Sequence, residues 1–280
     1  MQIAPYRPLR LLAGFLAIAG VLQLHSTAHA QSPDFAHFPY DRSAPLNIRQ
    51  VSVKVQNGVT IEDITYTGTN GDTVPAYLVI PKEKGKFAGI LWGHWLMPGA
   101  ANANRQEFLE EAIALAPHGV VSILIDDVHV RAGFNPVPGS APALIAQQVV
   151  DLRRALDLLL SRADIDAART AYVGHSFDAL TGSVLDAIDK RFAAFVFMTG
   201  PQLQAGYESY AHRLGPAPAL FQYGLHDEKW VPLTDAKAYI AAASGPKTVE
   251  FYDADHALNA KARVDRDNYL SKALNLKMLR

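Results

Sequence analysis

The segment that decides the fold reads TAYVGHSFDAL and covers residues 170–180. Its first half is apolar and too short for a helix, which is typical of a strand buried on both faces, and its end opens a helical pattern. Ser176 therefore lies at a strand-to-helix turn, where Gly174 allows the close backbone approach. Such a turn exposes the hydroxyl and directs helix N–H groups at a developing oxyanion. The alternative is that the serine only caps the helix.

Similar short apolar runs precede and follow this segment, and they alternate with helical patterns. This alternation predicts an α/β fold with a mostly parallel central sheet of about eight strands flanked by helices. Functional groups in such a sheet gather in the loops beyond the carboxyl ends of the strands. Strands are expected at 51–55, 59–66, 76–80, 88–92, 120–125, 170–173, 193–198, 219–223 and 249–252, and helices at about 105–116, 142–161, 179–188, 233–243 and 263–276.

Two loops after later strands supply an acid and a base. Asp227 follows the expected strand at 219–223, and His256 follows the next one. A serine hydroxyl needs an imidazole to take its proton and a third group to fix the tautomer of that imidazole. The order serine, acid, histidine therefore predicts a catalytic triad of Ser176, Asp227 and His256. Glu228 competes with Asp227 for the acid role because it lies in the same loop.

The motif GHSFDA at 174–179 resembles the α/β-hydrolase superfamily, in particular its dienelactone hydrolase-like and esterase-like branch. The resemblance covers roughly residues 50–275 and implies the α/β-hydrolase fold, an acyl-enzyme mechanism, and neither an organic cofactor nor a metal. Asp178 departs from the pattern because the family usually has glycine there, so we expect crowding of the turn and negative charge near the nucleophile. Only about twenty residues separate Met198 from Ala219, which leaves no room for a substantial cap domain.

Two backbone N–H groups are expected to form the oxyanion hole. Phe177 directly follows the nucleophile, so its N–H is the first donor. The segment GHWLMPG at 93–99 resembles the family's His-Gly oxyanion segment, which makes the N–H of Trp95 the second donor. A core aromatic at a strand end is the alternative for Trp95. The residues that could line an open substrate cleft are Trp230, Arg131 and Phe134.

The N-terminal residues differ in kind from the rest of the chain. Arg7 and Arg10 precede an apolar run at 11–24 that ends before Ala28-His29-Ala30, which predicts a secretory signal peptide over residues 1–30. The run is shorter than the roughly 20 residues that a transmembrane helix needs. The mature protein is therefore expected in the periplasm or the medium, without a membrane anchor. Residues 31–48 are rich in turn formers and predict an arm, and residues 49–280 form one α/β-hydrolase domain.

Composition sets further limits on function. The 280 residues are 49% hydrophobic, which is enough for one sizeable core. A net charge of -1 gives no basic footprint for nucleic acid, and the absence of cysteine excludes disulfides and a cysteine nucleophile. Within these limits, the candidate triad and the family resemblance imply a serine hydrolase acting on a small-molecule carboxylic ester. A peptidase or acyltransferase with the same triad, a noncatalytic binding protein of this fold, and the oligomeric state stay open.

Overall fold

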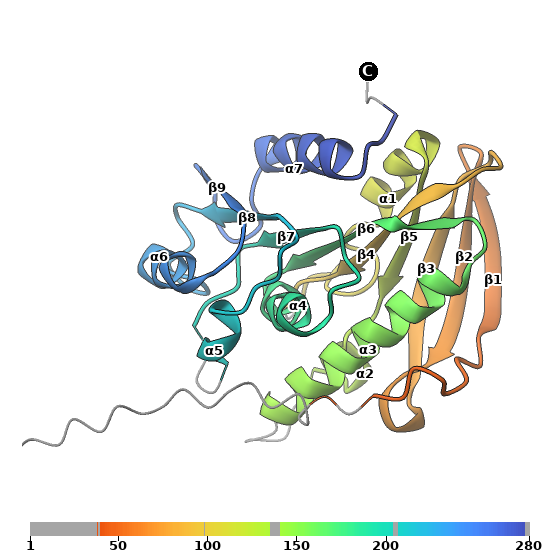
Figure 1. Ribbon diagram of the computed structural model, residues 1–280, viewed down its shortest axis with the longest axis horizontal. Coiled ribbons are helices and arrows are strands. Elements are labelled where there is room, and N and C mark those ends of the chain that lie inside the picture. Colours follow the sequence, from red (N-terminus) through yellow and green to blue (C-terminus); the bar gives the residue numbers. More distant parts are fainter. Residues whose placement is uncertain (1–37, 39, 98, 135–140, 204–206, 278–280) are drawn as a thin grey trace, which may run out of the picture. The chain divides into compact units, whose positions relative to one another are not determined.

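The computed structural model describes residues 38, 40–97, 99–134, 141–203 and 207–277, so the expected signal peptide lies outside the described residues. Within them, strands and helices alternate along the chain (Figure 1). The strands are β1 (Arg49–Gln56), β2 (Val59–Thr67), β3 (Thr73–Ile80), β4 (Phe87–Gly93), β5 (Val120–Ile125), β6 (Ile165–His175), β7 (Ala194–Met198), β8 (Ala219–Gly224) and β9 (Lys247–Tyr252). The α-helices are α1 (Leu109–Leu115), α2 (Val128–Arg131), α3 (Ala141–Ser161), α4 (Phe177–Ile188), α5 (Glu208–Ala211), α6 (Leu233–Ala242) and α7 (Ala260–Ala273).

One sheet joins all the strands of the described chain in the order β1-β2-β3-β5-β4-β6-β7-β8-β9. The first three pairings, β1 with β2, β2 with β3 and β3 with β5, are antiparallel. The five pairings from β5 through β4 to β9 are parallel. The expected mostly parallel sheet is confirmed, and its nine strands in the described residues match the nine expected strand segments, one more than the overall expectation of about eight strands.

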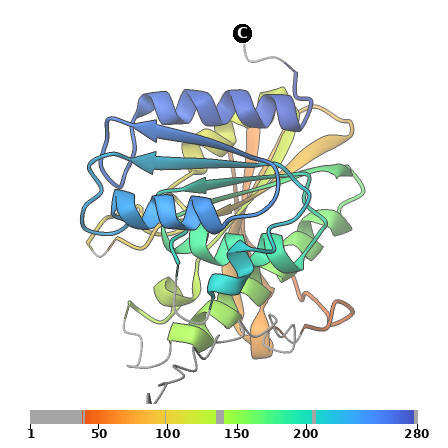
Figure 2. The same ribbon diagram turned by 60° about the vertical axis from the view of Figure 1, so that its left-hand side comes forward.

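Helices cover both faces of the sheet. Helices α3, α4 and α6 pack on one face, and α1 and α7 pack on the other (Figure 1). In Figure 2 the two blue helices, α6 and α7, lie on opposite sides of the C-terminal strands. All seven residues of β4 are buried, as expected for a strand covered on both faces. The apolar runs of the sequence thus form strands because both of their faces pack against helices.

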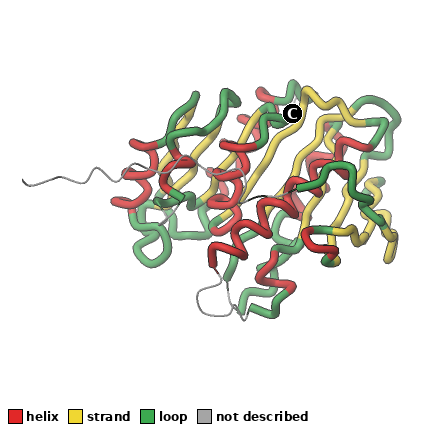
Figure 3. Tube along the Cα trace, turned by 60° about the horizontal axis from the view of Figure 1, so that its bottom comes forward, coloured by secondary structure: helices red, strands yellow, loops and turns green. Residues whose placement is uncertain are grey.

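Parallel pairing brings the carboxyl ends of the central strands to one edge of the sheet. Gly93 at the end of β4 pairs with Gly174, and His175 at the end of β6 pairs with Met198 of β7. The ends of β8 and β9 are likewise in register, and Figure 3 shows the yellow strands running side by side. The loops that follow β4, β6, β8 and β9 therefore meet at this edge.

The connection between β7 and β8 is short. In its described residues it holds one four-residue helix, α5, so no substantial cap domain is present there. No helix in the part of the chain that the structure describes is long and apolar enough to cross a membrane.

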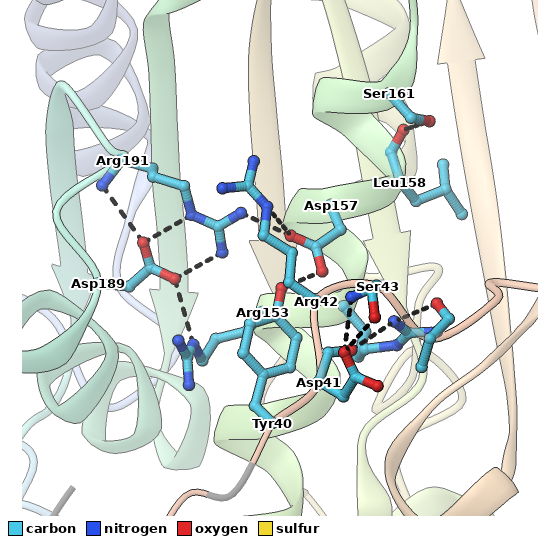
Figure 4. Close-up of polar contacts among 12 residues, drawn as sticks. Tyr40, Asp41, Arg42, Ser43, Arg153, Asp157, Leu158, Ser161, Asp189 and Arg191 are labelled. Carbon is cyan, nitrogen blue, oxygen red and sulfur yellow. Dashed lines mark hydrogen bonds and ion pairs between the residues drawn. The ribbon is translucent and has the colours of Figure 1, made fainter.

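A polar cluster fastens the segment 40–48 to helix α3 (Figure 4). The hydroxyl of Tyr40 donates to the carboxylate of Asp157, and the guanidinium of Arg153 lies 4.0 Å from the centroid of the Tyr40 ring. Arg191 Nη1 donates to the second oxygen of Asp157 at 2.5 Å. The segment before β1 therefore packs against α3, a helix far from it in the sequence.

Candidate active site

The turn between β6 and α4 holds Ser176 in a strained conformation. Ser176 has φ 57° and ψ -114°, a region that costs a residue with a side chain of order 1–3 kcal/mol. Its N–H donates to the carbonyl of Met198 at 2.8 Å. A Cβ atom at Gly174 would lie 2.3 Å from the carbonyl oxygen of Asp178, so only glycine fits there. The hydroxyl of Ser176 makes no capping bond to the helix and is left for another partner.

That partner is His256, which follows β9. The Nε2 atom of His256 lies 2.8 Å from Ser176 Oγ, and its Nδ1 atom lies 2.5 Å from Asp227 Oδ2. Because a carboxylate only accepts, Nδ1 carries the ring proton and Nε2 is free to accept from the serine hydroxyl. The structure therefore brings together the three residues that the sequence singled out. The rival acid, Glu228, is exposed on the same loop, whereas Asp227 is buried.

Asp227 remains ionised in spite of its burial. Burial raises the pKa of its carboxyl, but the hydrogen bond from His256, the electrostatic attraction of that ring and the N–H groups of Trp230 and Val231 outweigh this and lower the pKa below its usual value. Trp230 N donates to Asp227 Oδ1 at 3.1 Å, so both carboxylate oxygens have donors. The ionised carboxylate is thus held against Nδ1 of His256.

Two cavities lie at the three residues, one at the serine and one at the histidine. A cavity of about 240 Å³ is lined by Ser176 and Phe177, and a second of about 360 Å³ is lined by Asp227 and His256. Trp230 lines both, and its ring centroid lies 6.0 Å from that of His256. Trp230 therefore lies at the cleft, where the sequence expected a substrate-lining residue.

The expected second oxyanion donor is wrong. The N–H of Trp95 donates to Glu107 Oε2 at 2.7 Å, so this carboxylate takes up the donor. The carbonyl of Trp95 accepts from His94 Nδ1 at 2.7 Å. In a trans peptide the following N–H points the opposite way from the carbonyl, so the N–H of Leu96 faces away from His94.

Leu96 is the residue that the sequence missed. It lines the same cavity as Ser176 and Phe177. Its N–H donates to no acceptor among the described residues. The N–H of Phe177 lies at the first position of α4, where helical N–H groups lack an intrahelical acceptor. Both residues line the cavity that holds Ser176, and within the described chain neither N–H has a protein acceptor.

The other two expected cleft residues lie elsewhere. Arg131 pairs with the buried carboxylate of Asp151 in α3, and its own side chain is only 12% exposed. The expectation that Arg131 lines the cleft is wrong, because a buried ion pair holds its guanidinium and Arg131 lines neither of these two cavities. Phe134, at 40% exposure, is not among the described residues that line either cavity.

Asp178 turns into the interior. Its carboxylate accepts from Gln148 Nε2 at 3.0 and 3.2 Å and from Thr181 Oγ1 at 2.7 Å. Burial, together with the nearby carboxylate of Asp127, raises the pKa of Asp178 to about 7. Gly93 relieves the expected crowding of the turn because it has no side chain. A Cβ atom at Gly93 would lie 2.6 Å from the Cβ of Asp178.

Comparison with known proteins shows the fold. No family model and no curated protein matches the chain. Among solved structures, it is similar to an acetyl xylan esterase from Paenibacillus sp. R4, with 19% identity and a TM-score of 0.64 over 82% of this chain and 89% of that one. Acetyl xylan esterase 1 from Thermoanaerobacterium sp. JW/SL YS485 gives 16% identity and a TM-score of 0.66 over 85% and 91%. A putative dienelactone hydrolase from Klebsiella pneumoniae gives 18% and 0.56 over 74% and 94%.

These neighbours share their fold with this chain over most of their lengths. The chain therefore has the α/β-hydrolase fold, in the form found in esterases and dienelactone hydrolase-like proteins.

Proposed function

We propose that the chain is a serine hydrolase that cleaves a carboxylic ester through an acyl-enzyme. The observation that carries this proposal is the continuous contact from Asp227 through His256 to Ser176, at 2.5 and 2.8 Å. The strained serine turn supports it, as do the N–H groups of Leu96 and Phe177, which have no protein acceptor among the described residues. Solved structures of the same fold include acetyl xylan esterases, whose reaction belongs to this class.

In the proposed first step, Ser176 Oγ attacks the ester carbonyl and its proton passes to His256 Nε2. The N–H groups of Phe177 and Leu96 stabilise the negative charge on the former carbonyl oxygen. Removal of one such donor typically costs about 2.7–4 kcal/mol of transition-state stabilisation. The tetrahedral intermediate collapses, and the alcohol leaves with the proton from His256. Water then gives its proton to His256 and attacks the acyl-serine, which releases the acid and restores Ser176.

The proposed substrate carries a short acyl group. The cavity beside Ser176 has a volume of about 240 Å³, and the apolar side chains that line it include Phe177, Leu180 and Val231. The larger cavity of about 360 Å³ shares Trp230 with the first and is lined by charged residues, which suits a polar alcohol moiety. A short-chain or carbohydrate-linked ester fits this division.

Export through a signal peptide over residues 1–30 belongs to the same proposal. N-terminal sequencing of the protein secreted by an expression host should begin at Gln31. A mature chain that still begins at Met1 would refute export by cleavage.

The test is turnover of p-nitrophenyl acetate, propionate, butyrate and octanoate. The wild-type chain should hydrolyse the shorter esters best, and Ser176→Ala and His256→Ala should each lose several orders of magnitude, as members of a cooperative triad do. A matched panel of amides and acyl acceptors separates the esterase from a peptidase or acyltransferase. No hydrolysis by folded wild-type protein, or full activity in both variants, would reject the proposal.

A further inference from the structure

Glu107 joins two parts of the active site that lie far apart in the sequence. It belongs to the segment that precedes α1, and its side chain is only 9% exposed. One carboxylate oxygen, Oε2, accepts from the N–H of Trp95 in the loop after β4 at 2.7 Å. The other, Oε1, lies 2.5 Å from Nδ1 of His175, the residue before the nucleophile. A single buried carboxylate thus fixes the oxyanion-side loop against the end of β6.

His175 extends this contact to the backbone of the base. Its Nε2 atom lies 3.0 Å from the carbonyl oxygen of His256. A carbonyl only accepts, so Nε2 of His175 carries a proton, and a second proton lies between its Nδ1 and Glu107. The ring of His175 is stacked between those of Trp95 and His256, with centroid distances of 5.2 and 5.4 Å.

We propose that Glu107 and His175 are positioning residues that hold the loop of Trp95 and Leu96 and the backbone of His256 in the geometry that the reaction needs. Neither residue lines the cavity that holds Ser176, so both act through the groups they hold. The proposal rests on the proposed function, because its first readout is the rate of ester hydrolysis.

The consequence for catalysis follows from the direction of the peptide after Trp95. Glu107 holds the N–H of Trp95, and His94 holds its carbonyl, so the residue cannot rotate while both bonds persist. The next N–H, that of Leu96, keeps its direction for the same reason. Loss of Glu107 removes the acceptor of the Trp95 N–H and also the carboxylate that contacts Nδ1 of His175. A shift of about 1 Å at reacting groups can lower a rate about 10²-fold.

The structure offers a conservative variant that keeps every hydrogen bond. In Glu107→Gln, the amide oxygen still accepts from Trp95 and the amide nitrogen donates to Nδ1 of a neutral His175. That tautomer keeps its proton on Nε2 and still donates to the carbonyl of His256. Glu107→Ala removes all of these bonds. Glu110, an exposed acid in the first turn of α1, is the matched control position.

The experiment measures kcat and KM for p-nitrophenyl acetate, normalised to sites titrated with an organophosphate. Glu107→Ala should lower kcat about 10- to 100-fold with KM changed less than about threefold. Glu107→Gln should recover most of that loss, and Glu110→Ala should match wild type. The proposal is overturned if Glu107→Ala is less stable but keeps the wild-type kcat per titrated site. It is also overturned if Glu107→Gln does not recover the rate.

His175→Phe provides a second line, and it replaces Glu107→Ala should that variant fail to fold. It keeps the ring stack and removes both nitrogens, so it should lower kcat by a similar factor. In the double variant with Glu107→Ala the losses should not multiply, because both changes break one connection. Fully multiplicative losses, or wild-type kcat in His175→Phe, would refute the coupling. An inactive wild-type chain would instead refute the proposed function, so the two failures are distinguishable.

Discussion

The side chain of Asp178 occupies space that Gly93 leaves open. A Cβ atom at Gly93, the last residue of β4, would lie 2.6 Å from Asp178 Cβ and 2.7 Å from Asp178 Oδ2. The family resemblance led us to expect glycine at position 178, and Gly93 on the neighbouring strand leaves room for the aspartate that stands there instead. Helix α4 can therefore approach β4 closely with an aspartate in its first turn.

Gly93→Ala tests this compensation. The added methyl group would overlap Asp178 and the hydroxyl of Tyr172, so we expect a loss of about 1–3 kcal/mol in the free energy of unfolding. Urea denaturation gives the value. The loss should be smaller when Gly93→Ala is made in an Asp178→Gly background, since part of the overlap is then gone. An equal loss in both backgrounds would show that the two residues do not share this space.

Asp178 should also make stability depend on pH. Its native pKa of about 7 exceeds the value of about 3.9 for a solvated aspartate. Between these values the native state holds a proton that the unfolded chain has released, so the free energy of unfolding falls as pH rises from about 4 to 7. Below this window and above it, Asp178 contributes no slope.

Asp178→Asn removes the titrating group and should flatten the dependence. Urea midpoints of the two proteins at pH 4.5, 5.5, 6.5 and 7.5 give the comparison. If the wild type gains stability relative to Asp178→Asn as pH rises through the window, the assignment of a raised pKa is wrong.

The acid of the triad is identified by two adjacent substitutions. Asp227→Asn should lower kcat on the order of 10³- to 10⁴-fold, because an amide can donate to Nδ1 and so favour the wrong tautomer of His256. Glu228→Gln should change kcat less than about threefold, since Glu228 is exposed. Steady-state hydrolysis of p-nitrophenyl acetate measures both. The reverse order of effects would exchange the two roles.

Arg131 should matter for stability and not for substrate binding. Arg131→Met leaves the buried carboxylate of Asp151 without its ion-pair partner, so we expect a loss of about 3 kcal/mol in the free energy of unfolding. The control is Arg162→Met, which breaks a more exposed pair with Asp164 and should cost less than about 1 kcal/mol. KM should stay the same in both variants. A raised KM with unchanged stability in Arg131→Met would restore the substrate-binding role.

The sequence predicted the parts of the fold and site that depend on local pattern. Short apolar runs alternating with helical periods indicated the parallel sheet, and position just past a strand end marked Ser176, Asp227 and His256 as neighbours. Parallel pairing alone brings these three loops to one edge, so no knowledge of side-chain contacts was needed. Strand-end position does not separate Asp227 from the adjacent Glu228; the family resemblance favoured Asp227, and the structure buries Asp227 and exposes Glu228.

The errors concern contacts between irregular segments. The N–H of Trp95 is taken by Glu107, which the pattern placed inside a helix at 105–116, whereas α1 begins only at Leu109. The partner of Arg131 is an acid on the long helix α3, and nothing in either local sequence links the two. Motif spacing gives the chain position of a loop residue, but the direction of its N–H depends on which distant side chain binds it.

The central claim is that His256 activates the hydroxyl of Ser176. Mass spectrometry of the folded chain after reaction with a fluorophosphonate tests it most directly, because the reagent adds covalently only to an activated nucleophile. We predict one adduct, located at Ser176, formed rapidly by the wild type, at least about 10²-fold more slowly by His256→Ala, and absent in Ser176→Ala. No adduct on folded wild-type protein, or labelling at an equal rate in His256→Ala, would contradict the account.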